Sequence, residues 1–294
     1  MSVTVAITGA AGLLGKALIA TASDKYDLHL FTRNQHPETG HKWYSLDLST
    51  GSGLDLIYGL KPDIIIHSAA IGSVDYSQQN HHEAVNVNLS ATIDIIKLCT
   101  EINCKLIYIS TNAVFNGYKA PYCEGDLLSP INYYGISKAG AEYAVRYSKL
   151  QWAIIRPILM YGVPNLGRRG NWVTIWRDKF LAGKVCQVVD DVMTQPLYNV
   201  DCANAIWKTI ELEQYGQIFH VAGNDMLLLS DFAYCVADII GTSKSLIQPV
   251  PSSYFPSIAP RPANTTYILD KIHKVLGVYT CGVRDGVTKM LNSK

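Results

Sequence analysis

Short apolar segments alternate with helix-length segments through the first half of the chain, and this alternation constrains the fold more than any other feature. The apolar segments, which are rich in Val, Ile or Leu, are residues 3–8, 27–32, 63–68, 105–110 and 151–157. Segments this short and this apolar are typical of strands that are buried on both faces of a parallel sheet. The segments 81–100 and 132–149 are long enough to form helices between them. The sequence therefore predicts an α/β fold built on a doubly wound parallel sheet.

The regular alternation ends after the fifth apolar segment. Gly, Pro, Arg and Trp accumulate in residues 161–176, and a segment rich in Pro and Ser covers residues 248–262. We expect residues 1–157 to form the core and residues 158–294 to form mainly a smaller C-terminal lobe, with segments around 194–223 returning to the core. Such a lobe would lie at the carboxyl edge of the sheet, where folds of this class bind their ligands.

Composition excludes several classes of function. The chain has 294 residues, 17% of them charged, and a formal net charge of +1, which gives no electrostatic reason to expect nucleic acid or an anionic membrane as a partner. Polar residues interrupt every apolar run, and residues 1–10 enter a strand pattern at once, so we expect no membrane span and no signal peptide. The seven cysteines include no Cys-x-x-Cys pair and the eight histidines are scattered. We therefore expect free thiols, a cytoplasmic protein and no metal site.

Residues 8–15, TGAAGLLG, directly follow the first predicted strand and precede a predicted helix. In a strand–loop–helix unit of this kind, Gly9 permits the tight turn, Gly12 lets the backbone approach a pyrophosphate, and Gly15 lets the helix pack on the strand. The free amides and the helix N-terminus then hold the phosphates. The residues expected to contact a dinucleotide are Gly9, Ala11, Gly12, Leu13 and Leu14. The glycine spacing is one residue longer than the common fingerprint, and a plain strand-to-helix turn is the alternative.

The end of the second apolar segment carries Arg33 and no acidic residue. A carboxylate here would accept a hydrogen bond from the ribose 2′-hydroxyl of NAD, whereas a guanidinium pairs with the 2′-phosphate of NADP. We therefore expect NADP, with NAD as the alternative cofactor and a solvated loop arginine as the alternative reading. Asp47, with Leu48 beside it, follows a short strand and is placed to accept a hydrogen bond from the adenine amine. The small side chains of Ala69 and Ala70 leave room for the adenosine, although core packing would also explain them.

Tyr134 and Lys138 lie four residues apart in the segment YYGISKAGAE, so on a helix they share one face, one turn from each other. Tyr133 falls outside this register. A phenol with a pKa near 10 is a poor acid at neutral pH, and a fixed cation beside it lowers that pKa. A lysine one turn away is a candidate for that cation, and its charge would be worth about 1 to 4 kcal/mol at a few ångströms, which corresponds to a pKa lower by about one to three. The alternative is chance, because a Tyr and a Lys four residues apart occur often on exposed helices. Ser110 and Thr111 close the fourth apolar segment, where a hydroxyl that points into the crevice would hold a substrate carbonyl, unless it bonds its own backbone.

Several motifs, in their order and at their separations, carry a resemblance to a known family. They are TGAAGLLG, HSAA, STNAVFNG, YGISK and IIRPILMYG, and they resemble the extended short-chain dehydrogenases/reductases. The later segments NWV, TQPLYNVDCANAI, FHVAG and RPANTTYILDKIHKVLG resemble the dTDP-4-dehydrorhamnose reductase branch, which includes the regulatory β subunit of methionine adenosyltransferase. The resemblance covers nearly the whole chain. It implies that the core is a dinucleotide-binding Rossmann domain and that the C-terminal lobe binds the substrate.

The resemblance also implies roles for individual residues. Tyr134 would be the general acid, and Lys138 would lower its pKa and bind the nicotinamide ribose. Thr111 would be the third catalytic residue and would orient the carbonyl. Asn88 matches the asparagine that supports the cofactor site from a neighbouring helix. A hydride would pass from the nicotinamide to the carbonyl carbon while Tyr134 protonates the forming alkoxide.

The substrate side departs from the rhamnose-type reductases. Asn112 and Ala113 stand where those enzymes have Asp-Tyr, and Leu159 stands where they place a tryptophan against the sugar. Arg168, in a glycine-flanked loop, would pair with a nucleotide diphosphate, although exposed loop arginines are more often solvated. The residues expected to contact the substrate are Thr111, Asn112, Leu159, Arg168 and Asn171.

These patterns favour an NADP(H)-dependent reductase of a nucleotide-linked 4-keto-6-deoxy sugar. Two alternatives use the same motifs. One is a sugar-nucleotide epimerase or dehydratase that keeps NAD bound, and the other is a regulatory subunit that binds NADP without turnover. Members of the family often pair through the helices at 81–100 and 132–149, so a homodimer is a further expectation.

Overall fold

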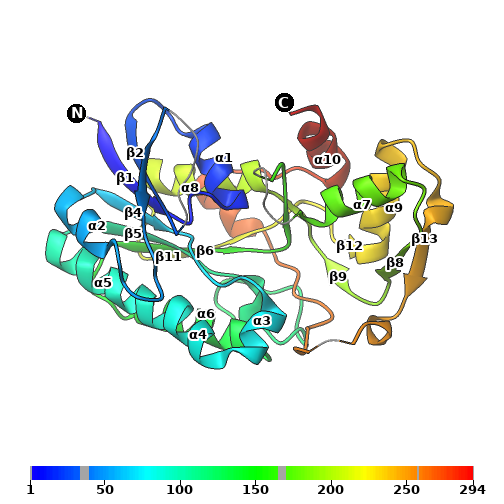
Figure 1. The fold of residues 1–294 in the computed structure, drawn as a ribbon, viewed down its shortest axis with the longest axis horizontal. Helices are drawn as coiled ribbons and strands as arrows, with labels where there is room; N and C mark the ends of the chain where they lie inside the picture. The colour runs from blue at the N-terminus through cyan, green and yellow to red at the C-terminus, as the bar shows by residue number, and fades with distance from the viewer. Residues whose placement is uncertain (1, 34–39, 165–169, 257, 294) are drawn as a thin grey trace.

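A parallel sheet of seven strands forms the centre of the protein (Figure 1). The computed structural model describes residues 2–33, 40–164, 170–256 and 258–293. The strands of the sheet are β1 (Val3–Thr8), β2 (Tyr26–Thr32), β3 (Lys42–Ser45), β4 (Ile64–His67), β5 (Lys105–Ile109), β6 (Trp152–Pro157) and β11 (Gln217–Val221). Their order is β11-β6-β5-β4-β1-β2-β3, so the winding reverses between β1 and β4. The doubly wound parallel sheet predicted from the sequence is confirmed, and the reversal marks the crevice where such sheets bind ligands.

The central strands are buried because their side chains alternate between two hydrophobic layers. In β1, Val5 and Ile7 belong to the layer that includes α1 (Leu13–Thr21) and α8 (Asn199–Glu211), whereas Ala6 between them belongs to the opposite layer. This alternation follows from the period of two along a strand. The helices on the opposite face are α2 (Leu54–Leu60), α4 (His81–Val85), α5 (Ala91–Ile102) and α6 (Tyr133–Arg146) (Figure 1).

The segment 81–100, expected as one helix, is interrupted between α4 and α5 by a π-helical turn, η1 (Asn86–Ser90). Single π turns inside helices are frequent at functional sites. Asn88 lies in this turn. Its side-chain amide bonds both backbone groups of Ile71, accepting from the N–H at 2.8 Å and donating to the carbonyl at 3.2 Å. It also donates to Ser137 Oγ at 3.1 Å. The turn therefore ties the loop after β4 to helix α6.

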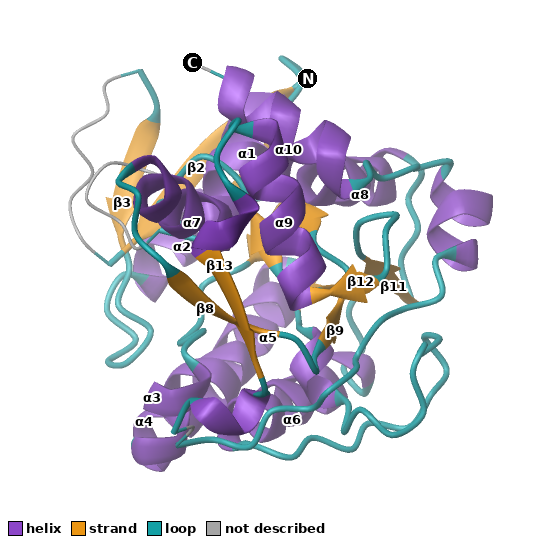
Figure 2. Cartoon of the chain, turned by 90° about the vertical axis from the view of Figure 1, so that its right-hand side faces the viewer, coloured by secondary structure: helices purple, strands orange, loops and turns teal. Residues whose placement is uncertain are grey.

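The C-terminal half adds a smaller lobe beside the sheet, which faces the viewer in Figure 2. The strands and helices of this lobe are β7 (Met160–Tyr161), α7 (Trp172–Leu181), β8 (Cys186–Val189), β9 (Met193–Thr194), β10 (Leu197–Tyr198), β12 (Leu227–Leu228), α9 (Leu229–Ile239), β13 (Ile247–Val250) and α10 (Val283–Asn292). The remaining short helices are α3 (Val74–Gln79), η2 (Asn112–Val114), η3 (Lys244–Leu246), η4 (Ser252–Tyr254) and η5 (Ile272–Leu276). The lobe has its own hydrophobic cluster around Trp176, Phe232 and Val287. The chain leaves the lobe for α8 and β11, and β11 pairs with β6 in the central sheet.

The seven cysteines are all free thiols, and four of them are buried. Among the described residues, no group of three or more His, Cys, Asp or Glu side chains is arranged to hold a metal ion. No helix in the described ranges is both long enough and apolar enough to span a membrane.

Candidate active site

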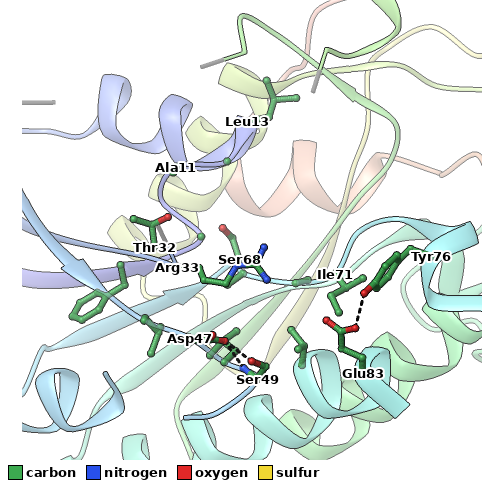
Figure 3. A pocket seen from close by; sticks show the side chains of 18 of the residues that line it. Ala11, Leu13, Thr32, Arg33, Asp47, Ser49, Ser68, Ile71, Tyr76 and Glu83 are labelled. Carbon is green, nitrogen blue, oxygen red and sulfur yellow. Dashed lines mark hydrogen bonds between the residues drawn. The ribbon is translucent and has the colours of Figure 1, made fainter. Parts of the chain in front are cut away.

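A cavity of about 680 Å³ lies at the point where the strand order reverses, beyond the carboxyl ends of β1, β2 and β4. Its size is typical of sites for small molecules and cofactors. The residues predicted to bind a cofactor that line this cavity are Gly9, Ala11, Gly12, Leu13, Arg33, Asp47, Leu48, Ala69 and Ala70 (Figure 3). Leu14 packs instead in the hydrophobic core, because its side chain lies on the buried face of α1. Asn88, Tyr134 and Lys138 are not part of the lining.

The glycine loop forms one wall of the cavity. Gly9 has φ +70°, and a Cβ there would come within 2.8 Å of the Ala69 nitrogen, so the turn requires glycine. A Cβ on Gly15 would lie 2.2 Å from the Ala10 carbonyl oxygen, which shows how closely α1 packs on the loop. Gly12 is the N-cap of α1, and the first turn of that helix carries no acidic residue. The helix N-terminus therefore offers unopposed positive polarity to the cavity, and the loop fits the pyrophosphate of a dinucleotide.

Charged side chains line the part of the cavity near the ends of β2 and β3. Asp47 accepts hydrogen bonds from Ser49 N at 2.9 Å and Ser49 Oγ at 2.6 Å, and these bonds, with a smaller effect from Arg33, hold the pKa of Asp47 below its usual value. Arg33 is exposed and lines the cavity. Further along the wall, the Tyr76 hydroxyl donates to Glu83 Oε2 at 2.6 Å (Figure 3). Among the described residues, the site thus presents the guanidinium of Arg33 for a phosphate and the carboxylates of Asp47 and Glu83 for hydroxyl or amine donors.

Close packing brings Tyr134 and Thr111 together. Asn132 caps helix α6 by accepting a hydrogen bond from Gly135 N at 2.8 Å. A Cβ on Gly135 would lie 2.1 Å from the Ala113 carbonyl oxygen, so the first turn of α6 presses against the loop that follows β5. Thr111 begins that loop and is 7% exposed. Tyr134 and Thr111 are therefore neighbours, and the Thr111 hydroxyl itself donates to Asn112 Oδ1 at 3.3 Å and accepts from Ala113 N at 3.1 Å.

Lys138 lies one helical turn after Tyr134 and is buried. Its Nζ donates to the Ile109 carbonyl at 2.7 Å and lies 4.2 Å from the centre of the Tyr108 ring. Burial lowers the pKa of Lys138 to about 7, while the charge of Glu142 acts in the opposite direction. The ammonium is therefore held at the end of β5 by a carbonyl and an aromatic face.

The pKa of Tyr134 differs from the expectation. Burial raises it above 10, and the neighbouring Thr111 hydroxyl opposes this rise. The prediction that Lys138 lowers the pKa of Tyr134 is wrong for this structure, because desolvation dominates and the ammonium is directed at Ile109. Of the two hydroxyls predicted at the end of β5, that of Ser110 donates to the buried carboxylate of Glu142 and so is not the one that would hold a substrate carbonyl.

The residues predicted to contact the substrate that the structure describes do not line the cavity. Asn112 Nδ2 donates to Thr265 Oγ1 at 2.6 Å, so its amide ties the loop after β5 to the C-terminal segment. Leu159 is half-buried and packs against the hydrophobic clusters of both the core and the lobe. Arg168 falls outside the described residues.

Asn171 has a structural role. It is the N-cap of α7, where its Oδ1 accepts from Thr174 N at 3.4 Å and its Nδ2 donates to the Gly162 carbonyl at 2.6 Å. Both ends of the amide are therefore used by the protein itself, as is usual for asparagine at a helix start.

Comparison with known proteins places the chain in a family. Residues 3–294 match the family described as RmlD substrate binding domain. The chain belongs to this family. The crystal structure of dTDP-4-dehydrorhamnose reductase from Bacillus anthracis in complex with NADP aligns with it at a TM-score of 0.88 and 26% identity, covering 99% of both chains. The family resemblance predicted from the sequence is confirmed.

Two relatives of this RmlD-family chain are named as different kinds of protein, one as a reductase and one as a subunit of methionine adenosyltransferase. dTDP-4-dehydrorhamnose reductase of Aggregatibacter actinomycetemcomitans is 26% identical over 284 residues, which is 92% of each protein. Methionine adenosyltransferase 2 subunit beta of Mus musculus is 28% identical over 305 residues, covering 99% of this chain and 89% of the relative.

Sequence reasoning missed several polar residues of the site, among them Glu142, Tyr76 and Glu83. Glu142 had a signal, because it follows Lys138 by four residues and so extends the face that carries Tyr134. Tyr76 and Glu83 had none, since their pairing depends on how α3 and α4 are placed around the cavity.

Proposed function

We propose that this protein is an NADP(H)-dependent reductase of a nucleotide-linked 4-keto-6-deoxy sugar. The observation that carries the proposal is that Thr111, Tyr134 and the buried ammonium of Lys138 lie together at the end of β5. These groups lie near a cavity whose glycine loop fits a dinucleotide, and Asn88 links the two regions through Ile71 and α6. The NADP-bound dTDP-4-dehydrorhamnose reductase of the same fold supports both the cofactor and the reaction class.

Each residue has a chemical task in this mechanism. When bound, NADPH supplies the hydride. Tyr134 stays protonated at neutral pH because burial raises its pKa, so its phenol has a proton to donate to the substrate carbonyl oxygen. Thr111 offers a hydroxyl to the same oxygen. The Lys138 ammonium stabilises negative charge as it develops on the alkoxide and then on the phenolate.

Two of the predicted cofactor contacts support NADPH. Arg33 is the cation that would pair with a 2′-phosphate, and the amides at the start of α1 would hold the pyrophosphate. Asp47 would accept from the adenine amine. Arg168 stays a proposal for the nucleotide diphosphate.

The test is NADPH oxidation, followed by absorbance, with dTDP-linked 4-keto-6-deoxy sugars generated by a coupled dehydratase and epimerase. Wild type should oxidise NADPH, and Tyr134→Phe should lose about 100-fold or more of the turnover while still binding NADPH, because a positioned general acid contributes about 10²–10⁴-fold. Tyr133→Phe is the matched control, because its phenol belongs to the adjacent residue and should be dispensable. Full turnover by Tyr134→Phe would refute the mechanism.

A second candidate is a regulatory subunit that binds NADP without turnover. Methionine adenosyltransferase 2 subunit beta matches 99% of this chain, and the Asp-Tyr pair of the reductases is replaced here by Asn112 and Ala113. The side-chain amide of Asn112 lies on the side expected to face the substrate, but it donates its hydrogen bond to Thr265 Oγ1 within the protein. Tight NADPH binding with no oxidation across a panel of keto-sugar nucleotides would favour this candidate.

We also propose a cytoplasmic homodimer. The seven free thiols are consistent with a reducing compartment. Helices α5 and α6, where the family often pairs, expose the apolar side chains of Ile93, Ile136 and Tyr143, and Tyr147 directly after α6 is also exposed. Light scattering coupled to size-exclusion chromatography would test the pairing, and a monomer at micromolar concentration would contradict it.

A further inference from the structure

A buried ion pair lies behind the catalytic tyrosine. Glu142 and Arg156 are both fully buried, and the pair is bidentate, with Arg156 Nε donating to Oε1 at 2.9 Å and Nη2 donating to Oε2 at 2.7 Å. The Ser110 hydroxyl also donates to Glu142 Oε1. The carboxylate thus accepts hydrogen bonds from two sides, and its position is fixed by β5 and β6. A buried pair of this kind is costly to desolvate, so its presence invites a functional explanation.

Arg156 Nη1, the guanidinium nitrogen that does not bond Glu142, faces neutral groups. Arg156 Nη1 lies 3.1 Å from His220 Nε2, and because a guanidinium has no acceptor, that nitrogen must accept the hydrogen bond. His220 Nδ1 then donates to the Tyr122 carbonyl at 3.2 Å. Burial and the charge of Arg156 hold the pKa of His220 well below its usual value, so the imidazole is neutral. The charges of this cluster in the described residues are those of Glu142 and Arg156, with Glu124 and Lys271 at its edge, where Glu124 Oε1 accepts from His220 N at 3.0 Å and the charge of Lys271 helps to lower the pKa of His220.

The end of β5 connects this ion pair to Lys138. The Ile109 carbonyl accepts from Lys138, and the hydroxyl of the next residue, Ser110, donates to Glu142. Tyr134, Lys138 and Glu142 are also spaced by four residues along α6, so they follow one another on one face of the helix. The proton donor, the ammonium and the carboxylate therefore form a row against the same strand end.

The other groups that face Lys138 are neutral. From β4, His67 has its pKa lowered to about 3 by burial and by the charge of Lys138 itself. From β5, burial raises the pKa of Tyr108 well above its usual value, and from α6 burial also raises that of Tyr134. In the part of the chain that the structure describes, Glu142 is the charged group that raises the pKa of Lys138.

We propose that Glu142 is a positioning residue for the reduction, whose fixed carboxylate is the counter-charge that keeps Lys138 an ammonium beside Tyr134. This inference rests on the proposed reductase function. It explains why an ion pair is retained behind the site, with Arg156 and Ser110 serving to hold the carboxylate. The effect matters near neutrality, because the pKa of Lys138 is about 7 and a lowering by one would reduce the protonated fraction at pH 7 from about one half to about one tenth.

The experiment compares two variants that break the same ion pair from opposite ends. Glu142→Gln removes the counter-charge, and Arg156→Gln removes the competing cation but leaves the carboxylate. Lys138 is titrated by NMR in protein labelled with [ε-¹³C]lysine, its signal being identified by its loss in Lys138→Met, and kcat is measured against pH with the keto-sugar nucleotide. Glu124→Gln is the matched control, because it neutralises a carboxylate of the same cluster on the side away from Lys138.

We expect Glu142→Gln to lower the Lys138 midpoint by one pH unit or more and Arg156→Gln to raise it or leave it unchanged. Turnover of Glu142→Gln should fall about fivefold or more at pH 7 and recover as the pH falls towards 5.5, with little change in KM, as expected when the protonated fraction of Lys138 limits kcat. Glu124→Gln should resemble wild type. If Glu142→Gln does not fold, the double variant Glu142→Gln/Arg156→Gln leaves no unpaired charge and should still lower the midpoint.

Loss of turnover at every pH, or shifts of the same sign in Glu142→Gln and Arg156→Gln, would mean that the pair is merely structural and would overturn the inference. Failure of the proposed function is a separate result. If wild type binds NADPH but reduces no sugar nucleotide, the NMR titration still decides whether Glu142 controls the charge of Lys138.

Discussion

Replacement of Lys138 by methionine tests whether the active-site ammonium is held at a cost to stability. The Lys138 side chain is 2% exposed, and burial lowers its pKa from 10.5 to about 7. Methionine has a similar shape and carries no charge, so it should fill the same space without the desolvation cost. We expect Lys138→Met to be more stable than wild type at acidic pH and inactive as a reductase.

The expected magnitude follows from the two pKa values. A pKa difference of one corresponds to about 1.4 kcal/mol, so the step from 10.5 to about 7 costs the folded protein about 5 kcal/mol when both states carry the proton. The unfolded chain holds this proton more tightly, so the cost is fully present below about pH 7, declines as the pH rises, and disappears above about pH 10.5. About 2 kcal/mol of it should remain at pH 9.

Part of this gain is offset in the variant. Methionine leaves the Ile109 carbonyl without the hydrogen bond from Lys138, which costs about 1–3 kcal/mol. The net stabilisation by Lys138→Met should therefore be about 2–4 kcal/mol at pH 6 and close to zero at pH 9.

Urea unfolding at pH 6 and pH 9 measures both values. Lys97→Met is the matched control, because Lys97 is an exposed lysine of α5 whose ion pair with Asp94 should change stability by less than about 0.5 kcal/mol. The reasoning is refuted if Lys138→Met is less stable than wild type at pH 6, or if its advantage does not shrink at pH 9.

Three further predictions concern the glycine loop, a helix cap and the cofactor. Gly15→Ala should destabilise the protein by about 3 kcal/mol, because its Cβ would lie 2.2 Å from the Ala10 carbonyl oxygen; a thermal unfolding midpoint equal to that of wild type would contradict this. Asn171→Ala should cost about 1 kcal/mol in urea unfolding through loss of the α7 cap, with NADPH affinity unchanged. Arg33→Ser should weaken NADPH about tenfold or more and leave NADH unaffected, because charge-assisted bonds are worth about 1.5–3 kcal/mol; fluorescence titrations giving an unchanged ratio of the two dissociation constants would count against the 2′-phosphate site.

The sequence by itself determined the central sheet and the cofactor wall of the site. Buried parallel strands must be apolar on both faces, so segments such as residues 3–8 are visible without any tertiary information. Glycine at positions 9 and 15 was equally visible, because a positive φ and a close helix–strand approach are local demands that other residues fail. The four-residue spacing of Tyr134 and Lys138 also follows from helix geometry alone.

Tertiary structure decided what those side chains do. The Ser110 hydroxyl donates to the buried Glu142, which leaves Thr111 as the hydroxyl beside Tyr134, and adjacent residues in a sequence give no sign of this. The π turn that holds Asn88 against Ile71 likewise depends on long-range contacts.

The direction of the pKa shifts depended on tertiary structure as well. Spacing alone suggested that Lys138 would acidify Tyr134, but folding buries both groups, and desolvation raises the pKa of the phenol while it lowers that of the amine. A sequence fixes which charges exist and how far apart they lie along a helix. The dielectric surroundings and the partners that set their protonation arise when strands and helices distant in the chain pack around them.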